Sequence, residues 1–194
     1  TPIASSAASD VYKRQKHAEA QVASVIMALA GAASAIAAEI RMPATSLDEA
    51  AGAVNADGDT QKKLDVIADD IVLDVLAGTG VASYLSEERE EAIPVNDGGT
   101  MIVACDPLDG SSNIGVNVSV GTIFSLLPAS GGELQPGRSQ LAAGFFVYGP
   151  QTTLLLTVGS GTASFRMEDD GGFRLLEERV GIPQTCLLYT SPSP

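Results

Sequence analysis

Two carboxylates stand three residues apart, at Asp106 and Asp109, in the stretch "DPLDGSSNI". Pro107 restricts the backbone between them, so both carboxylates can face one side, with the Leu108 carbonyl available as a third oxygen ligand. Hard oxygen ligands of this kind suit Mg²⁺ or Mn²⁺. The first half of the stretch therefore has the residue types of a cation site.

The second half of the stretch has groups that suit an anion. Gly110 lets the backbone approach a ligand closely or adopt a positive φ, and Ser111 and Ser112 can donate hydrogen bonds to phosphate oxygens. A phosphate ester that bridges a metal and N–H donors needs this pairing. Asp, Pro, Gly, Ser and Asn are also the residues favoured in turns. From residue types alone, a surface turn explains the stretch at least as well as a site does.

Further acids stand near the ends of predicted elements. Asp59 precedes a predicted helix and Asp65 lies within it, while Glu87 and Glu88 end a short predicted strand. With the pair in "DPLDG", three separate segments thus supply carboxylates that could surround a cation. Each of these acids could instead be an ordinary solvated surface residue, and adjacent acids such as "SEE" are usually solvated.

Composition narrows the possible functions. The 194 residues carry a formal net charge of −13, which disfavours nucleic acid and anionic membranes as partners but leaves phosphorylated small molecules open. The chain has two cysteines and one histidine, His17. Cys105 lies in an apolar run and is expected to be a small buried side chain. Zinc sites built on His and Cys, and Ser–His–Asp catalysis, therefore have little support.

The expected elements are two helices followed by strands. Ala-rich residues 17–41 predict one long helix, and apolar residues at helical spacing in 62–78 predict a second, with Asp69, Asp70 and Asp74 on its solvated face. The Ala-rich segment also resembles a signal peptide, but we interpret it as a buried helix because its apolar run is too short to span a bilayer.

Short apolar runs predict the strands. The expected segments are 81–88, 101–105 (ending abruptly at Asp106–Pro107), 118–129, 141–149, 152–168 and 172–180. Helices first and then closely spaced strands predict an α+β fold of layered helices and a mixed sheet, with antiparallel pairing among the later strands.

The two ends of the sequence differ in character from the residues between them. Residues 1–15 and 185–194 show no periodicity and resemble translated sequencing-adapter read-through, so we expect both to be non-native tails. The domain is then expected over residues 16–184, as a fragment of a longer protein.

Several motifs in order resemble one family. "GDTQKKLDV", "SEE", "DPLDGSSNI", "VSVGTIF", "LQPGR" and "AAGFFVYG" are similar to the N-terminal part of class I fructose-1,6-bisphosphatase. This family is the sugar-bisphosphatase branch of the metal-dependent, lithium-sensitive phosphatases, and the resemblance implies the N-terminal portion of their αβαβα fold. "DPLDGSSN" with "SEE" upstream and "GTIF" downstream is the specific part of the match.

The resemblance implies a role for each matching residue. The implied metal ligands are Glu87, Glu88, Asp106, the Leu108 carbonyl and Asp109. Asp65 and Glu88 would polarise the attacking water, and Asp59 would help to position a mobile loop and metal. The implied contacts to the scissile phosphate come from Asp109, Gly110, Ser111, Ser112 and Asn113.

The implied activity is hydrolysis of the 1-phosphate of fructose 1,6-bisphosphate, in gluconeogenesis or the Calvin cycle. The implied cofactor is Mg²⁺, with Mn²⁺ and Zn²⁺ as alternatives. The implied setting is a cytoplasmic homotetramer whose partner is a small sugar bisphosphate, without nucleic acid or membrane.

Other interpretations stay open. The motifs indicate binding of metal and phosphate, and they do not distinguish sugars of different length. A sedoheptulose-1,7-bisphosphatase or a dual-specificity enzyme is therefore equally consistent with the sequence. A non-catalytic cation-binding module is a second alternative. Thr100–Met101 replaces the Lys-Tyr pair of the animal AMP site, which leaves AMP control open although Arg138 matches. Because the family's sugar-binding half is absent, we expect the fragment alone to be inactive and to expose apolar surface on its "FFVYG" and "TTLLLTV" strands.

Overall fold

The computed structural model describes residues 20–41 and 56–181, with side chains from Leu64 onward in the second range. The tails expected at 1–15 and 185–194, and with them His17, lie outside the described residues. The expected helix at 17–41 is present from Ala20.

Among the described residues, two long helices precede the sheet. They are α2 (Ala20–Arg41) and α3 (Ala56–Leu76). The strands are β1 (Val81–Ser86), β2 (Ile93–Pro94), β3 (Met101–Asp109), β4 (Val120–Pro128), β5 (Ala142–Tyr148), β6 (Thr152–Thr157), β7 (Thr162–Met167) and β8 (Phe173–Glu177). Three short 3₁₀ helices lie between strands. After β3 comes η2 (Ser111–Val116), and between β4 and β5 come η3 (Ala129–Gly131) and η4 (Gly137–Ser139).

The strands form one mixed sheet in the order β2-β1-β3-β4-β5-β6-β7-β8. β1 and β3 pair in parallel, and every other neighbouring pair is antiparallel. The predicted α+β class, the mixed sheet and the antiparallel pairing of the later strands are therefore confirmed. β1 and β3 point the same way, so their carboxyl ends meet at one edge.

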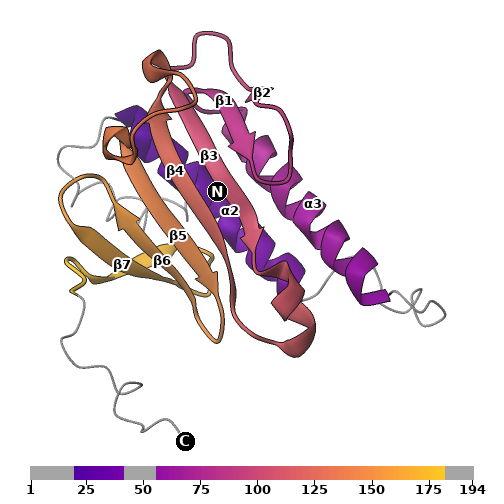
Figure 1. Ribbon diagram of the computed structural model, residues 1–194. Coiled ribbons are helices and arrows are strands. Elements are labelled where there is room, and N and C mark those ends of the chain that lie inside the picture. The colour runs from indigo at the N-terminus through magenta and orange to yellow at the C-terminus, as the bar shows by residue number, and fades with distance from the viewer. Residues whose placement is uncertain (1–19, 42–55, 182–194) are drawn as a thin grey trace, which may run out of the picture.

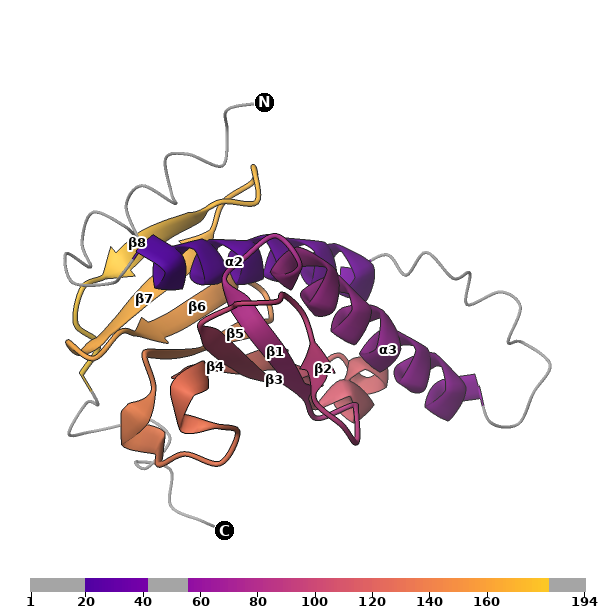
Figure 2. The same cartoon turned by 90° about the horizontal axis from the view of Figure 1, so that it is seen from above.

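Helices α2 and α3 cover one face of the sheet, as Figure 1 and the view from above in Figure 2 show. β4 illustrates the two faces, because Val120, Thr122, Phe124 and Leu126 are buried, whereas Ile123 between them is 46% exposed. We call the face that carries Ile123 the open face. Within the described part of the chain it has no helical layer over it.

Helix α2 is long and apolar enough, by length and composition, to cross a membrane. In the structure it instead packs its buried residues into the core, against α3 and the sheet. Val25, Ile26 and Leu29 are each no more than 1% exposed. The interpretation of this segment as a buried helix agrees with that packing.

Candidate active site

Strand β3 does not end at Asp106, as the sequence predicted, but continues to Asp109. Asp106 pairs with Ile123 of β4, and Asp109 pairs with Gly121. Three steps along β3 therefore match two steps along β4, which defines a β-bulge. The bulge absorbs Pro107, whose missing N–H would otherwise interrupt the ladder.

The bulge decides where the two carboxylates point. Residues three apart in a regular strand face opposite sides of the sheet. The extra residue reverses this, because Asp106 and Asp109 oppose Ile123 and Gly121, which lie two apart on the open face. Both carboxylates therefore project from the open face, on one side, as the spacing indicated.

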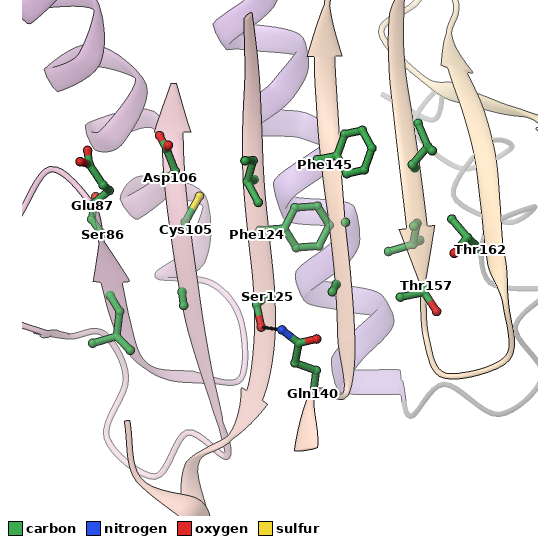
Figure 3. A pocket seen from close by; sticks show the side chains of 17 residues that line it. Ser86, Glu87, Cys105, Asp106, Phe124, Ser125, Gln140, Phe145, Thr157 and Thr162 are labelled. Atoms are coloured by element: carbon green, nitrogen blue, oxygen red, sulfur yellow. Dashed lines mark hydrogen bonds between the residues drawn. The ribbon is translucent and has the colours of Figure 1, made fainter. Parts of the chain in front are cut away.

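The acids after β1 lie beside those of β3. The Glu87 N–H donates to the Cys105 carbonyl at 3.0 Å, which extends the parallel pairing by one residue. Figure 3 shows Glu87 and Asp106 next to one another at the same end of their strands. Glu88 follows in the turn, where its N–H donates to the Ser86 hydroxyl at 3.2 Å. Cys105 itself is buried, as expected.

Helix α3 contributes Asp65 to the same region. The Ser111 hydroxyl, in η2, donates to Oδ2 of Asp65 at 3.1 Å. Gly110 precedes η2 with φ of 79°, a conformation that glycine adopts without strain. The turn after β3 therefore lies against α3.

Burial and the charges of neighbouring acids raise the pKa of three carboxyl groups in this region, those of Asp65, Glu88 and Asp106. Burial is the main cause of a raised pKa at Asp106, and the charges of Asp109, Glu87 and Asp65 add to it. Burial also raises the pKa of Asp65, with a further contribution from Glu87. The pKa of Glu88 is raised by burial first and then by Asp65 and Glu87. These acids come from α3, from the turn after β1 and from β3, and they form one electrostatic cluster. We call it the acidic cluster; its members are Asp65, Glu87, Glu88, Asp106 and Asp109.

The chemistry of the acidic cluster fits a hard divalent cation. Its donors are all carboxylate oxygens, and their mutual repulsion would be relieved by positive charge. Oδ1 of Asp65 is buried and has no hydrogen-bond partner among the described residues. In the described ranges, no three His, Cys, Asp or Glu side chains lie close enough together to hold a metal ion as they stand. Coordination by several of them would require side-chain rotations.

The other predicted site residues are placed as follows. Asp59 lies within α3 rather than in a loop before it, so that expectation was wrong; the helix begins at Ala56. The Leu108 side chain is buried, and its N–H donates to Oδ1 of Asp106 at 3.2 Å. Ser112 and Asn113 are exposed in η2.

The expectation of a solvated face for Asp69 was also wrong, because this side chain is only 2% exposed. The Tyr84 hydroxyl donates to Oδ1 of Asp69 at 2.9 Å, and Arg89 pairs with Oδ2. These partners offset the desolvation that makes a buried carboxylate costly. Asp70, which also pairs with Arg89, and Asp74 are exposed as expected.

A groove of about 700 Å³ runs over the open face beside the acidic cluster. Its wall is mostly apolar, and Glu87 and Asp106 lie at one end of it (Figure 3). Phe145 of β5 lines it and is 41% exposed. The expected apolar exposure on the "FFVYG" strand is therefore present at Phe145.

Two buried hydroxyls were missed as candidate functional residues. Thr122 donates to the Pro107 carbonyl at 2.7 Å, and the Tyr148 hydroxyl lies 2.7 Å from Thr122 Oγ1. The available signal was the alternation of β4, which places a polar threonine on an otherwise apolar, inward-facing row.

Comparisons with known proteins agree on one family. The family model "Fructose-1-6-bisphosphatase, N-terminal domain" matches residues 7–178. A class 1 fructose-1,6-bisphosphatase from Paracoccus denitrificans is 46% identical over 169 residues, which cover 84% of this chain and 51% of the relative. One from Rhizobium meliloti is 50% identical over 154 residues, covering 74% and 44%.

A solved structure agrees as well. Leishmania major fructose-1,6-bisphosphatase in its holo form matches with a TM-score of 0.77 and 30% identity, over 92% of this chain and 56% of that one. The chain spans about half the length of the curated relatives it matches. It belongs to the fructose-1,6-bisphosphatase family and corresponds to the N-terminal domain of that family.

Proposed function

We propose that this chain is the metal- and phosphate-binding half of a divalent-metal-dependent fructose-1,6-bisphosphatase. The reaction is hydrolysis of the 1-phosphate of fructose 1,6-bisphosphate, which yields fructose 6-phosphate and phosphate. The observation that carries the proposal is the acidic cluster, in which burial and the charges of neighbouring acids raise the pKa of Asp65, Glu88 and Asp106 at one edge of the sheet. The names of the relatives supply the substrate.

The proposed ligands of Mg²⁺, or of Mn²⁺ or Zn²⁺ in its place, are Glu87, Glu88, Asp106, the Leu108 carbonyl and Asp109. A bound cation supplies charge neutralisation at the transferred phosphoryl group and a more acidic water. The β-bulge supports this assignment, because it turns Asp106 and Asp109 to one face.

Asp65 is the proposed proton acceptor for the attacking water, with Glu88 beside it. Oδ1 of Asp65 has a free acceptor site among the described residues, while Oδ2 accepts from Ser111. Burial raises the pKa of Asp65, which makes its carboxylate a stronger base for a proton of the attacking water.

Residues 109–113 are the proposed contacts to the scissile phosphate, and Asp59 is proposed to position a mobile loop and metal. The hydroxyl and amide side chains of Ser112 and Asn113 are exposed and supply hydrogen-bond donors. The whole enzyme is proposed to be a cytoplasmic homotetramer that acts on the sugar bisphosphate and binds neither nucleic acid nor membrane, in gluconeogenesis or the Calvin cycle. This half alone is proposed not to turn over.

Metal binding is tested on the chain itself. Calorimetric titration with Mg²⁺ should give saturable binding that Asp106→Ala and Glu87→Ala each weaken by at least tenfold, since each removes a proposed ligand. Asp74→Ala removes an exposed acid of α3 outside the cluster and should bind like the unaltered chain. Equal weakening by all three variants would argue for diffuse charge attraction instead.

Catalysis is tested in a chimera that joins this chain to the second half of the Paracoccus denitrificans relative. Mg²⁺-dependent phosphate release from fructose 1,6-bisphosphate is expected from the chimera and is expected to be lost in its Asp106→Ala form. Faster release from sedoheptulose 1,7-bisphosphate would reassign the substrate. A folded chimera that binds Mg²⁺ without phosphate release would support a non-catalytic module.

A further inference from the structure

We propose that Thr122 and Tyr148 are positioning residues that hold the β3 bulge, so that the Leu108 N–H stays aimed at the Asp106 carboxylate. Neither residue is among the expected ligands or catalytic groups. The inference rests on the proposed function, because it assigns these two side chains to the same cation site. It depends on one hydrogen-bonded chain that runs from β5 through β4 to the bulge.

The direction of the hydrogen bonds in this chain is fixed. The Pro107 carbonyl can only accept, so Thr122 must use its single hydroxyl proton for that 2.7 Å bond. In the 2.7 Å contact between Thr122 and Tyr148, Thr122 Oγ1 is therefore the acceptor and the Tyr148 hydroxyl is the donor. Burial raises the pKa of the Tyr148 phenol, so it keeps this proton at any ordinary pH.

One peptide plane carries the effect to the open face. The Pro107 carbonyl and the Leu108 N–H belong to the same planar trans peptide, in which they point in opposite directions. The carbonyl is held by Thr122 on the buried side, and the N–H donates to Oδ1 of Asp106 at 3.2 Å. Fixing the carbonyl therefore fixes the N–H, which in turn holds the Asp106 carboxylate and leaves its Oδ2 for another partner.

The position of Thr122 explains why a hydroxyl is present there. Thr122 is the residue of β4 between Gly121 and Ile123, and the bulge lies opposite it. Pro107 lies inside the bulge and has no paired residue in the register of β3 with β4. A buried carbonyl without a hydrogen bond is costly, and the Thr122 hydroxyl supplies one. Thr122 is 2% exposed and Tyr148 is 6% exposed, so water cannot readily replace either one.

The size of the effect follows from similar arrangements around metal ligands. Groups that orient a ligand without touching the metal typically change metal affinity by roughly 10–100-fold when removed. Thr122→Val preserves the shape of the side chain and removes only the donor. Tyr148→Phe removes the hydroxyl that donates to Thr122. Its effect on metal affinity should be smaller, because the hydrogen bond from Thr122 to the Pro107 carbonyl remains.

The first readout needs no metal. Hydrogen exchange of the Leu108 amide, measured by NMR relative to the Val103 amide in the same strand, should accelerate at least tenfold in Thr122→Val. Thr122→Ser retains the hydroxyl and should restore slow exchange. Thr152→Val, at another buried threonine of the sheet, is the matched control and should leave this ratio unchanged.

The second readout is the Mg²⁺ affinity of the same variants by calorimetry. Thr122→Val should weaken binding about tenfold or more, and Thr122→Ser and Thr152→Val should not. An unchanged Leu108 exchange ratio in Thr122→Val overturns the inference. Accelerated exchange together with a wild-type chain that binds no Mg²⁺ would keep the positioning of Asp106 and refute the proposed cation site. Accelerated exchange with unaltered Mg²⁺ affinity would also overturn the inference, since the positioning would then have no effect on the site.

Discussion

The Ser111 hydroxyl donates a hydrogen bond to Oδ2 of Asp65 and so joins the turn after β3 to helix α3. The two residues are 46 positions apart in the chain, and the bond is made at a carboxylate whose other oxygen is buried without a partner among the described residues. Ser111 therefore stabilises the ionised form of Asp65 against the burial that opposes it. The turn and the helix act as one site through this contact.

Ser111→Ala should raise the pKa of Asp65 further above its ordinary value. The variant removes the hydrogen bond from Ser111, which lowers this pKa, and leaves the burial that raises it. The ¹³C shift of the Asp65 carboxyl, followed against pH in the metal-free chain, reports the change. Ser111→Thr keeps the hydroxyl and should titrate like the unaltered chain. A lower pKa in Ser111→Ala would contradict the assigned role of the bond.

Asp106→Asn should stabilise the metal-free chain at neutral pH. The raised pKa values of Asp65, Glu88 and Asp106 mean that the folded state binds their protons more tightly than the unfolded state does. Their stabilising contribution is therefore fully present below the ordinary carboxyl pKa and is lost as pH rises through the raised values. Asparagine removes one charge and keeps an oxygen that can accept from the Leu108 N–H.

Thermal unfolding checks this expectation. At pH 7.5, the Tm of Asp106→Asn should exceed that of the unaltered chain by about 2 °C or more. For a domain of this size, a change of about 1 kcal/mol in the free energy of unfolding shifts Tm by roughly 2–4 °C. The difference should shrink toward pH 4, where the carboxyls become protonated. Asp74→Asn, an exposed acid outside the cluster, is the control. A less stable Asp106→Asn at pH 7.5 would show that repulsion in the cluster is negligible.

The sequence predicted the α+β class, a mixed sheet, antiparallel pairing of the later strands and the segments that carry the acids, because each depends on local periodicity and turn residues. It did not predict the bulge, since Asp106–Pro107 has the residues of a strand end and only the pairing with β4 shows that β3 continues.

Other properties depend on partners distant in the chain. Asp69 and Asp70 are adjacent and of one type, yet only Asp69 is buried, because Tyr84 and Arg89 reach it from 15 and 20 residues away. Thr122 lay within a recognised motif, but its partner Tyr148 is 26 residues further along. Local patterns carry no information about such pairings.

Asp69→Ala should destabilise the chain by roughly 2–4 kcal/mol, since it leaves the buried Tyr84 hydroxyl without its acceptor and Arg89 without its main partner. Asp70→Ala removes the other, 61% exposed partner of Arg89 and should cost less than about 1 kcal/mol. Urea unfolding of both variants measures the difference. Equal losses would mean that the burial of Asp69 contributes nothing specific.

Phe145→Thr should reduce the binding of the apolar dye ANS to the folded chain. Phe145 lines the groove on the open face and is 41% exposed, so it offers apolar surface that helices α2 and α3 do not cover. Threonine retains high strand propensity, and the strand should therefore persist.

Leu134→Thr is the control, because Leu134 is 99% exposed but lies outside the groove. If dye binding reflects the groove, Phe145→Thr should lower the fluorescence and Leu134→Thr should not. Equal reductions would show that the dye responds to isolated exposed side chains, and the open face would then not be a continuous apolar surface.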